Sequence, residues 1–151
     1  MDSNFYYMKT CLSIFLFLVF FSVNSYAQKV ELASLDFLIN VKGVSELSKQ
    51  EVVQIFRNGR SLWSNSDKVL IVLPANNSVL ASDVAANLYG STVSGMQKFW
   101  LALVFQGRAN PPVFLQTAEE ILSFVKNNPG AIGVIPSGSL EIPANFKLKV
   151  R

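Results

Sequence analysis

The residue types that most often carry catalysis or hold metal ions are scarce in this sequence. No histidine occurs among the 151 residues, and Cys11 is the only cysteine. Serine–histidine and cysteine–histidine nucleophile pairs, histidine or thiolate metal sites and structural disulfides are therefore excluded. Glu119 and Glu120 are adjacent on an expected helix, so their side chains diverge, and carboxylates at a helix start favour the helix dipole. We expect no enzyme, no metal site and no cofactor.

Two short polar segments follow apolar runs that are typical of buried strands. Asn76, Asn77 and Ser78 follow the first run, and Ser137 and Ser139 follow the second. Ligands of open α/β sheets lie beyond the carboxyl ends of strands, often at a helix N-terminus where unpaired amides favour an anion. If the two strands are neighbours, these side chains form one small polar pocket. The same residue types also serve as turn and cap residues, and that alternative stays open.

The strands that must position these loops are marked by two kinds of apolar pattern. Residues 69–73 and 131–135 are continuous apolar runs, as expected for strands covered on both faces of a parallel sheet. Residues 35–41 alternate between more and less apolar positions, which predicts a further strand. Residues 146–150 alternate apolar residues with lysines, and the lysines predict an edge strand guarded against further pairing.

Four helices are expected between and after these strands. Three begin at a serine or threonine followed three residues later by Glu or Gln, which is the pattern of a capping box. These pairs are Ser48 with Glu51, Ser94 with Gln97, and Thr117 with Glu120. The remaining helix covers residues 79–89 and ends at Gly90. The alternation of strands and helices predicts an α/β domain with a mixed, mainly parallel sheet flanked by helices.

Residues 1–27 are typical of a secretory signal. Lys9 precedes an apolar run at 12–23, and the segment that follows ends in small residues at Ala27. The run is too short for a typical spanning helix, so we expect cleavage after Ala27 and no stable membrane insertion afterwards. Met8 is an alternative start, and an uncleaved anchor is the alternative interpretation. The expected product is one periplasmic or secreted domain, residues 28–151.

The charge pattern gives no sign of a nucleic-acid partner. The formal net charge is +3, and no basic run interleaved with aromatic residues occurs. The positive mean hydropathy of +0.34 owes much to the apolar segment before Ala27. The remainder has the composition of an ordinary globular domain.

Several short motifs follow one another in a familiar order along residues 35–135. They are Leu47-Ser48-Lys49, Ile55-Phe56-Arg57-Asn58-Gly59, Trp63-Ser64, Phe99-Trp100, Val104-Phe105-Gln106-Gly107-Arg108, Pro111-Pro112 and Asn128-Pro129-Gly130-Ala131-Ile132-Gly133. In these motifs the sequence resembles the short, single-lobe members of the phosphate ABC transporter substrate-binding protein family.

The resemblance implies one lobe of a type 2 periplasmic-binding-protein-like fold. It also implies capture of phosphate or another small oxyanion for import through a transporter permease, with full-length relatives closing two lobes over the ligand. The family's arginine and Ser-Gly-Thr ligands fall on Pro74 and on Ser78-Val79-Leu80, so only the serine is retained. The family tyrosine after Ala-Ile-Gly is Val134. We therefore expect weak or altered small-anion binding, with a ligand-free envelope interaction or scaffold module that docks on a protein partner as the alternative.

Overall fold

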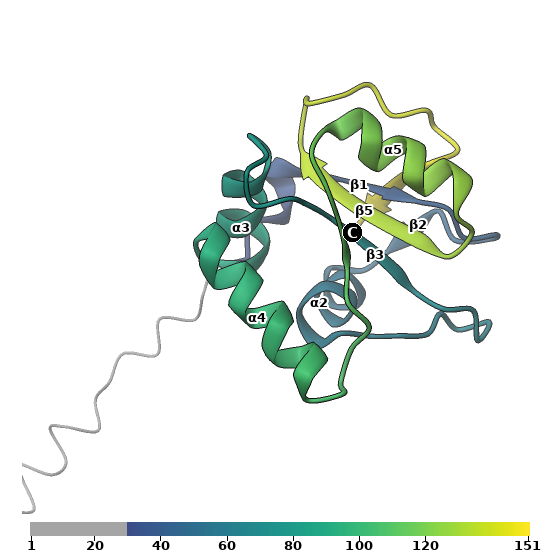
Figure 1. The fold of residues 1–151 in the computed structure, drawn as a ribbon. Helices are drawn as coiled ribbons and strands as arrows, with labels where there is room; N and C mark the ends of the chain where they lie inside the picture. Colours follow the sequence, from purple (N-terminus) through teal and green to yellow (C-terminus); the bar gives the residue numbers. More distant parts are fainter. Residues whose placement is uncertain (1–29) are drawn as a thin grey trace, which may run out of the picture.

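The computed structural model describes residues 30–151, which form one six-stranded sheet with helices on both faces (Figure 1). A short 3-10 helix, η1 (Leu32–Ser34), precedes the first strand. The strands are β1 (Leu35–Ile39), β2 (Glu46–Leu47), β3 (Leu70–Pro74), β4 (Val113–Leu115), β5 (Ala131–Pro136) and β6 (Lys147–Val150). The helices are α2 (Lys49–Asn58), α3 (Ala81–Tyr89), α4 (Val93–Phe105) and α5 (Ala118–Asn127).

The sheet has the strand order β2-β6-β1-β5-β3-β4. Strand β3 lies parallel to both β4 and β5, and β2 lies parallel to β6. Strand β1 runs antiparallel to its two neighbours, β5 and β6. The predicted α/β domain with a mixed, mainly parallel sheet is therefore confirmed.

Helix α5 covers one face of the sheet, and α2, α3 and α4 cover the other (Figure 1). Side chains along β5 contribute to the hydrophobic cores on both faces of the sheet. Ile132 and Val134 are buried against the three-helix side, and Ile135 is buried on the α5 side. Gly133 lets α5 approach closely, because a Cβ there would lie 2.8 Å from the Ile121 side chain.

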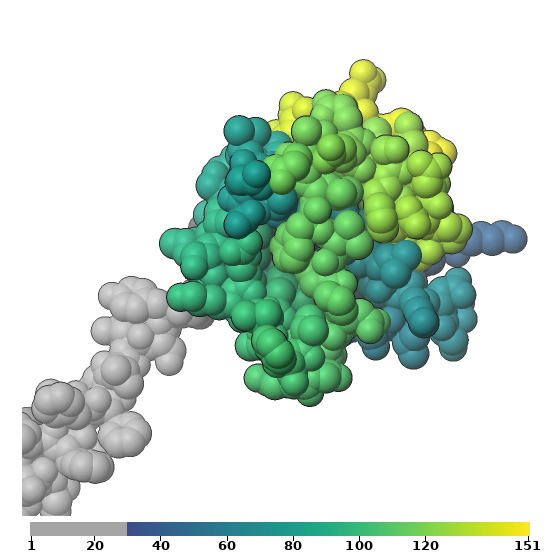
Figure 2. All heavy atoms as spheres, in the orientation of Figure 1, coloured from purple at the N-terminus to yellow at the C-terminus, as the bar shows by residue number. Residues whose placement is uncertain are grey.

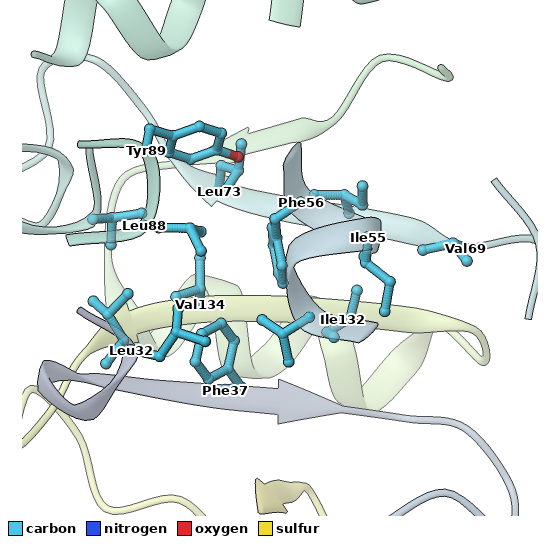
Figure 3. Packing of buried hydrophobic residues seen from close by; sticks show 14 of the residues in the cluster. Leu32, Phe37, Ile55, Phe56, Val69, Leu73, Leu88, Tyr89, Ile132 and Val134 are labelled. Atoms are coloured by element: carbon cyan, nitrogen blue, oxygen red, sulfur yellow. The ribbon is translucent and has the colours of Figure 1, made fainter. Parts of the chain in front are cut away.

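The larger core fills the space between α2, α3, α4 and the sheet (Figure 3). Ile55 and Phe56 point from α2 toward the sheet, where Phe37 of β1 and Ile132 of β5 meet them (Figure 3). The rings of Phe37 and Phe56 have centroids 5.7 Å apart in a tilted arrangement. This contact fixes α2 on the sheet.

Two of the three predicted capping boxes are confirmed. Ser48 accepts a hydrogen bond from the Glu51 amide at 3.2 Å, and Glu51 accepts one from the Ser48 amide at 2.8 Å. Thr117 and Glu120 make the same reciprocal pair at 3.2 and 3.3 Å. Hydrogen bonds from Ser48 lower the pKa of the Glu51 carboxyl below its usual value.

Two details of the sequence prediction are wrong. Helix α4 is capped by Thr92, whose hydroxyl accepts from the Gly95 amide at 3.2 Å, so Ser94 lies inside the helix. Strand β6 is not an edge, because it lies between β1 and β2. Its lysines instead form ion pairs across the sheet, Lys147 with Asp36 at 3.3 Å and Lys149 with Glu46 at 3.7 Å.

The predicted signal, residues 1–27, and the alternative start at Met8 lie outside the described residues. Within residues 30–151, none of the helices combines the length and the apolar character that crossing a membrane requires.

Candidate functional site

The two polar loops predicted to carry a site leave the same edge of the sheet. Strands β3 and β5 are adjacent and parallel, so both of their carboxyl ends, with that of β4, lie at one edge. We call this the carboxyl edge. The condition on which the predicted pocket depended, that the two strands are neighbours, is therefore met.

The loop after β3 is held by hydrogen bonds to Gln116, which follows β4. The Gln116 side-chain amide donates to the Asn77 side-chain oxygen at 2.7 Å, and the Ser78 hydroxyl donates to the Gln116 carbonyl at 2.6 Å. The Ser78 hydroxyl also accepts from the Leu80 amide at 3.2 Å. Asn76 is exposed. The one hydroxyl that the resemblance retains as a ligand thus already has a donor and an acceptor within the chain.

The loop after β5 turns toward a different neighbour. Ser137 and Ser139 are both exposed, and the Ser137 amide donates to the Ser34 carbonyl at 2.9 Å, just before β1. The Ser139 amide donates to the Pro136 carbonyl at 3.2 Å. The hydrogen bonds therefore tie Asn77 and Ser78 to the end of β4 and Ser137 to the start of β1, on opposite sides of the β3–β5 pair.

The carboxyl edge carries acidic residues in its helix starts and no basic residue in its loops. No lysine or arginine occurs in residues 69–97, 109–125 or 127–146, which contain all the loops that follow β3, β4 and β5. Asp83 lies in the first turn of α3, and Glu119 and Glu120 lie in that of α5. The local charge opposes the attraction that helix N-termini offer to an oxyanion.

Gln116 was not among the residues expected at this edge. Its backbone amide donates to the Glu120 carboxylate at 2.8 Å, in addition to the contacts with Asn77 and Ser78. This one residue links the loop after β3, the end of β4 and the start of α5. Its position just before the Thr117 capping box was the available signal in the sequence.

A second feature is an apolar groove between α4 and β4, which we call the α4 groove. It has a volume of about 420 Å³. It is lined by Ser94, Gln97, Lys98, Trp100, Leu101, Val104, Pro111, Pro112 and Phe114. Large apolar side chains are exposed along it or beside it, with Leu101 57%, Phe105 82% and Phe114 39% exposed. In Figure 2, the green atoms of α4 and of the segment after it lie together on the face turned to the viewer.

The sequence prediction did not find the α4 groove because α4 is apolar nearly all round. Met96, Trp100 and Leu103 are buried, but Val104 is only half-buried and lines the groove. The signal available in the sequence was the pair Leu101 and Phe105, which are four residues apart. Such spacing places two side chains together on one helix face.

Behind the groove, Trp100 and Tyr89 form a buried polar pair. The Trp100 indole nitrogen donates to the Tyr89 hydroxyl at 2.7 Å, which joins α4 to α3. Both residues belong to the core, and Trp63 is buried as well. Burial raises the pKa of the Tyr89 phenol well above its ordinary value, while the hydrogen bond from Trp100 acts in the opposite direction.

This raised pKa predicts a loss of stability in alkali. In the unfolded chain the phenol ionises near pH 10, whereas in the folded chain it keeps its proton to a higher pH. The contribution of the buried, protonated Tyr89 phenol to the free energy of unfolding is therefore complete below about pH 10 and decreases as the pH rises further. Above about pH 10, we expect the free energy of unfolding of the unaltered protein to fall more steeply than that of Tyr89→Phe. The expected difference in slope approaches about 1.4 kcal/mol per pH unit. Urea unfolding between pH 8 and pH 11 measures both slopes, and equal slopes would contradict the prediction.

Groups of three or more Asp, Glu, His or Cys side chains placed to hold a metal ion are absent from residues 30–151. One carboxylate at the carboxyl edge, that of Glu120, has a local structural function. Glu120 completes the cap of α5 and also accepts from Gln116.

The sheet order and the helices on both faces define one lobe of the type 2 periplasmic-binding-protein-like fold. Three solved structures of phosphate transport proteins are similar to this chain in fold. An ABC-type phosphate transport receptor from Vibrio cholerae matches with a TM-score of 0.54 and 14% identity. PstS from Borrelia burgdorferi matches with a TM-score of 0.57 and 15% identity. A protein from Clostridium perfringens, assigned as a phosphate ABC transporter substrate-binding protein and solved with bound phosphate, matches with 0.54 and 15%.

Each match covers 78% of this chain and less than half of the other protein, 46%, 47% and 44% respectively. The chain thus resembles phosphate ABC transporter substrate-binding proteins in fold, over a region that corresponds to a single lobe. No family model matches the sequence, and no curated protein matches it.

Proposed function

We propose that this chain is an exported, non-enzymatic interaction module built on one lobe of the solute-binding fold, and that it docks on a protein of the cell envelope. The observation that carries the proposal is the state of the carboxyl edge. The Ser78 hydroxyl and the Asn77 side chain bind within the chain, and the loops there contain no lysine or arginine. The edge where the fold would hold an anion is thus poorly suited to one, whereas the α4 groove exposes apolar surface.

A second candidate is weak or altered binding of a small oxyanion such as phosphate, delivered to a transporter permease. It is favoured by the shared edge, where Asn76, Asn77, Ser78, Ser137 and Ser139 follow two adjacent parallel strands. Against tight binding, the resemblance places Pro74 and Leu80 where the family has arginine and threonine. A charge-assisted donor and a hydroxyl each contribute on the order of 1.5–3 kcal/mol, so their loss weakens binding by about 10²- to 10⁴-fold.

Titration calorimetry with phosphate and sulfate separates the two candidates. We expect no heat from a site tighter than about 1 mM, and no rise in melting temperature at millimolar anion. A micromolar dissociation constant that Ser78→Ala weakens would establish anion capture and remove the support for the interaction module. Ser64→Ala provides a matched control, since Ser64 is exposed and precedes β3, at the opposite end of that strand from Ser78.

Export has its own test. Intact-mass measurement of the protein recovered from the culture medium or the periplasm is expected to give a chain that begins at Gln28. A chain that retains the apolar segment at 12–23 and stays with the membrane would contradict cleavage and favour the anchored alternative.

Docking is tested first without reference to any particular surface. An amine-reactive crosslinker applied to whole cells reaches the lysines on several sides of the described domain, such as Lys42, Lys98 and Lys126. We expect a defined protein adduct of higher mass. The same chain recovered only as an uncrosslinked monomer would contradict the interaction module.

A further inference from the structure

We propose that the α4 groove binds an amphipathic helix of another protein, with its apolar face in the groove and acidic residues along its border. This inference rests on the proposed interaction module and names its surface and its partner's chemistry. Three observations about the groove lead to it: the shape and composition of its wall, the state of the β4 edge, and the charge around it.

The wall of the groove is suited to apolar side chains presented at helical spacing. Leu101 and Val104 project from α4, and Phe114 faces them from β4. Phe114 lies on the α4 side because its neighbours Val113 and Leu115 pack on the α5 side, and side chains alternate along a strand. Anchors three or four residues apart on a helix fit such a groove.

The edge of β4 offers few backbone donors to a partner that would add as a strand. The Ala75 amide donates to the Leu115 carbonyl at 2.7 Å, so Leu115 and Val113 turn their backbone groups toward β3. Pro112 and Phe114 then face outward, and Gln116 follows the end of β4. Pro112 has no N–H, and the Gln116 N–H already donates to Glu120. Only the Phe114 N–H remains among the three, so binding depends on side chains.

The charge around the groove selects an acidic partner. Residues 84–118 contain Lys98 and Arg108 and no aspartate or glutamate. Lys98 lines the groove, and Arg108 lies three residues beyond the end of α4. Within residues 30–151, neither cation forms an ion pair. Carboxylates bordering a bound helix would complement both cations.

A second copy of this chain fits the groove less well. A symmetric contact would place Lys98 and Arg108 of one copy near the same residues of the other. A typical protein–protein interface also involves about 20–30 residues on each side, whereas nine residues line the groove. A membrane surface is also a weaker candidate, because the site is concave and two cations add only about 1 kcal/mol each.

Site-specific photo-crosslinking in cells of the native host tests the inference on the full chain. A photoreactive phenylalanine analogue replaces Phe105, and a second variant carries it at Val79. Val79 is 89% exposed but lies in the loop between β3 and α3, so it serves as a control for exposed apolar positions. We expect an adduct from position 105 and none from position 79. Mass spectrometry of the adduct is expected to identify a segment with apolar residues at helical spacing bordered by Asp or Glu.

Two further changes test the chemistry of the groove. Leu101→Ser is expected to lower the yield of the adduct by about tenfold or more, since a buried apolar anchor dominates such interfaces. Lys98→Glu is expected to lower it as well, and to make it less sensitive to salt. Circular dichroism provides the control for folding, and we expect both variants to give the spectrum of the unaltered protein.

The outcomes separate this inference from the proposed function. An amine-crosslinked protein adduct without any adduct from position 105 would overturn the α4 groove as the surface and leave the interaction module standing. An adduct with a second copy, with lipid alone, or with a segment that lacks acidic residues would overturn the partner's chemistry. Equal yields from positions 79 and 105 would also overturn it. No adduct from either reagent would remove the proposed function itself.

Discussion

Replacing Gly130 by alanine is expected to lower the free energy of unfolding by about 3–5 kcal/mol. Gly130 has a φ of +88°, where side chains are strained, and a Cβ there would clash with the Lys68 backbone carbonyl. The residue also anchors three hydrogen bonds. Its carbonyl accepts from the Leu70 amide at 3.0 Å and the Trp63 indole at 2.9 Å, and its amide donates to the Asn40 carbonyl at 2.7 Å. The clash cannot be relieved without moving the start of β3.

Gly138→Ala is the matched control for this change. Gly138 has a nearly equal φ of +81°, but nothing lies within 4 Å of an added Cβ. Its replacement therefore measures the backbone cost alone, about 1–2 kcal/mol. Urea unfolding followed by tryptophan fluorescence compares the two variants, because Trp63 and Trp100 are both buried. Equal losses for the two would show that the close approach to Lys68 is unimportant.

Phe56→Ala is expected to cost about 3–5 kcal/mol, the usual loss when a buried phenylalanine becomes alanine. Phe56 is fully buried and its ring packs on Phe37, so the change removes the aromatic contact between α2 and β1. Because small domains are stable by about 5–15 kcal/mol, much of the stability depends on this one ring.

Phe105→Ala provides the control, because it makes the same change within a helix at a side chain that is 82% exposed. We expect its effect on unfolding to stay within about 0.5 kcal/mol. The same substitution is expected to weaken docking at the α4 groove. A large loss of stability in Phe105→Ala would mean that this ring serves the fold and would weaken the case for a binding surface.

Features set by neighbouring residues were predicted correctly from the sequence. The capping pairs at Ser48 and Thr117 each involve residues three apart, and both form as expected. Strands β3 and β5 are covered on both faces and appear as continuous apolar runs. Local hydrogen bonds require particular residue types at a fixed spacing, and burial on both faces requires a continuous apolar run. These elements could therefore be predicted without knowing the fold.

The errors concern contacts between distant residues. Ser94 and Gln97 have the spacing of a capping box, but α4 is capped two residues earlier, at Thr92, where Val93 packs against the core. The lysines of β6 were interpreted as protection of an edge. In the sheet, Lys147 and Lys149 meet Asp36 and Glu46 on the neighbouring strands, and no local pattern indicates those partners.

The candidate site shows the same division. The condition for a shared edge is met, because β3 and β5 are parallel neighbours. The loops after these two strands carry the five predicted residues, Asn76, Asn77, Ser78, Ser137 and Ser139. Their function as one pocket remains a prediction. Whether a hydroxyl is free for a ligand depends on residues such as Gln116, which lies 38 positions from Ser78. The α4 groove could not be derived either, since it requires knowing that β4 lies beside α4.

The position of β5 in the sheet has a consequence for how the chain folds during synthesis. This strand is hydrogen-bonded to both β1 and β3, yet it begins only at Ala131. More than ninety residues, from Ile39 to Ala131, must therefore be synthesised after β1 before its neighbours β5 and β6 can pair with it. Pairing across such sequence separations is slow, because loop closure precedes any gain from contact. A ribosome-bound chain would hence stay without its central strand pairs until late, which would suit the export proposed above, because an exported chain crosses the membrane before it folds.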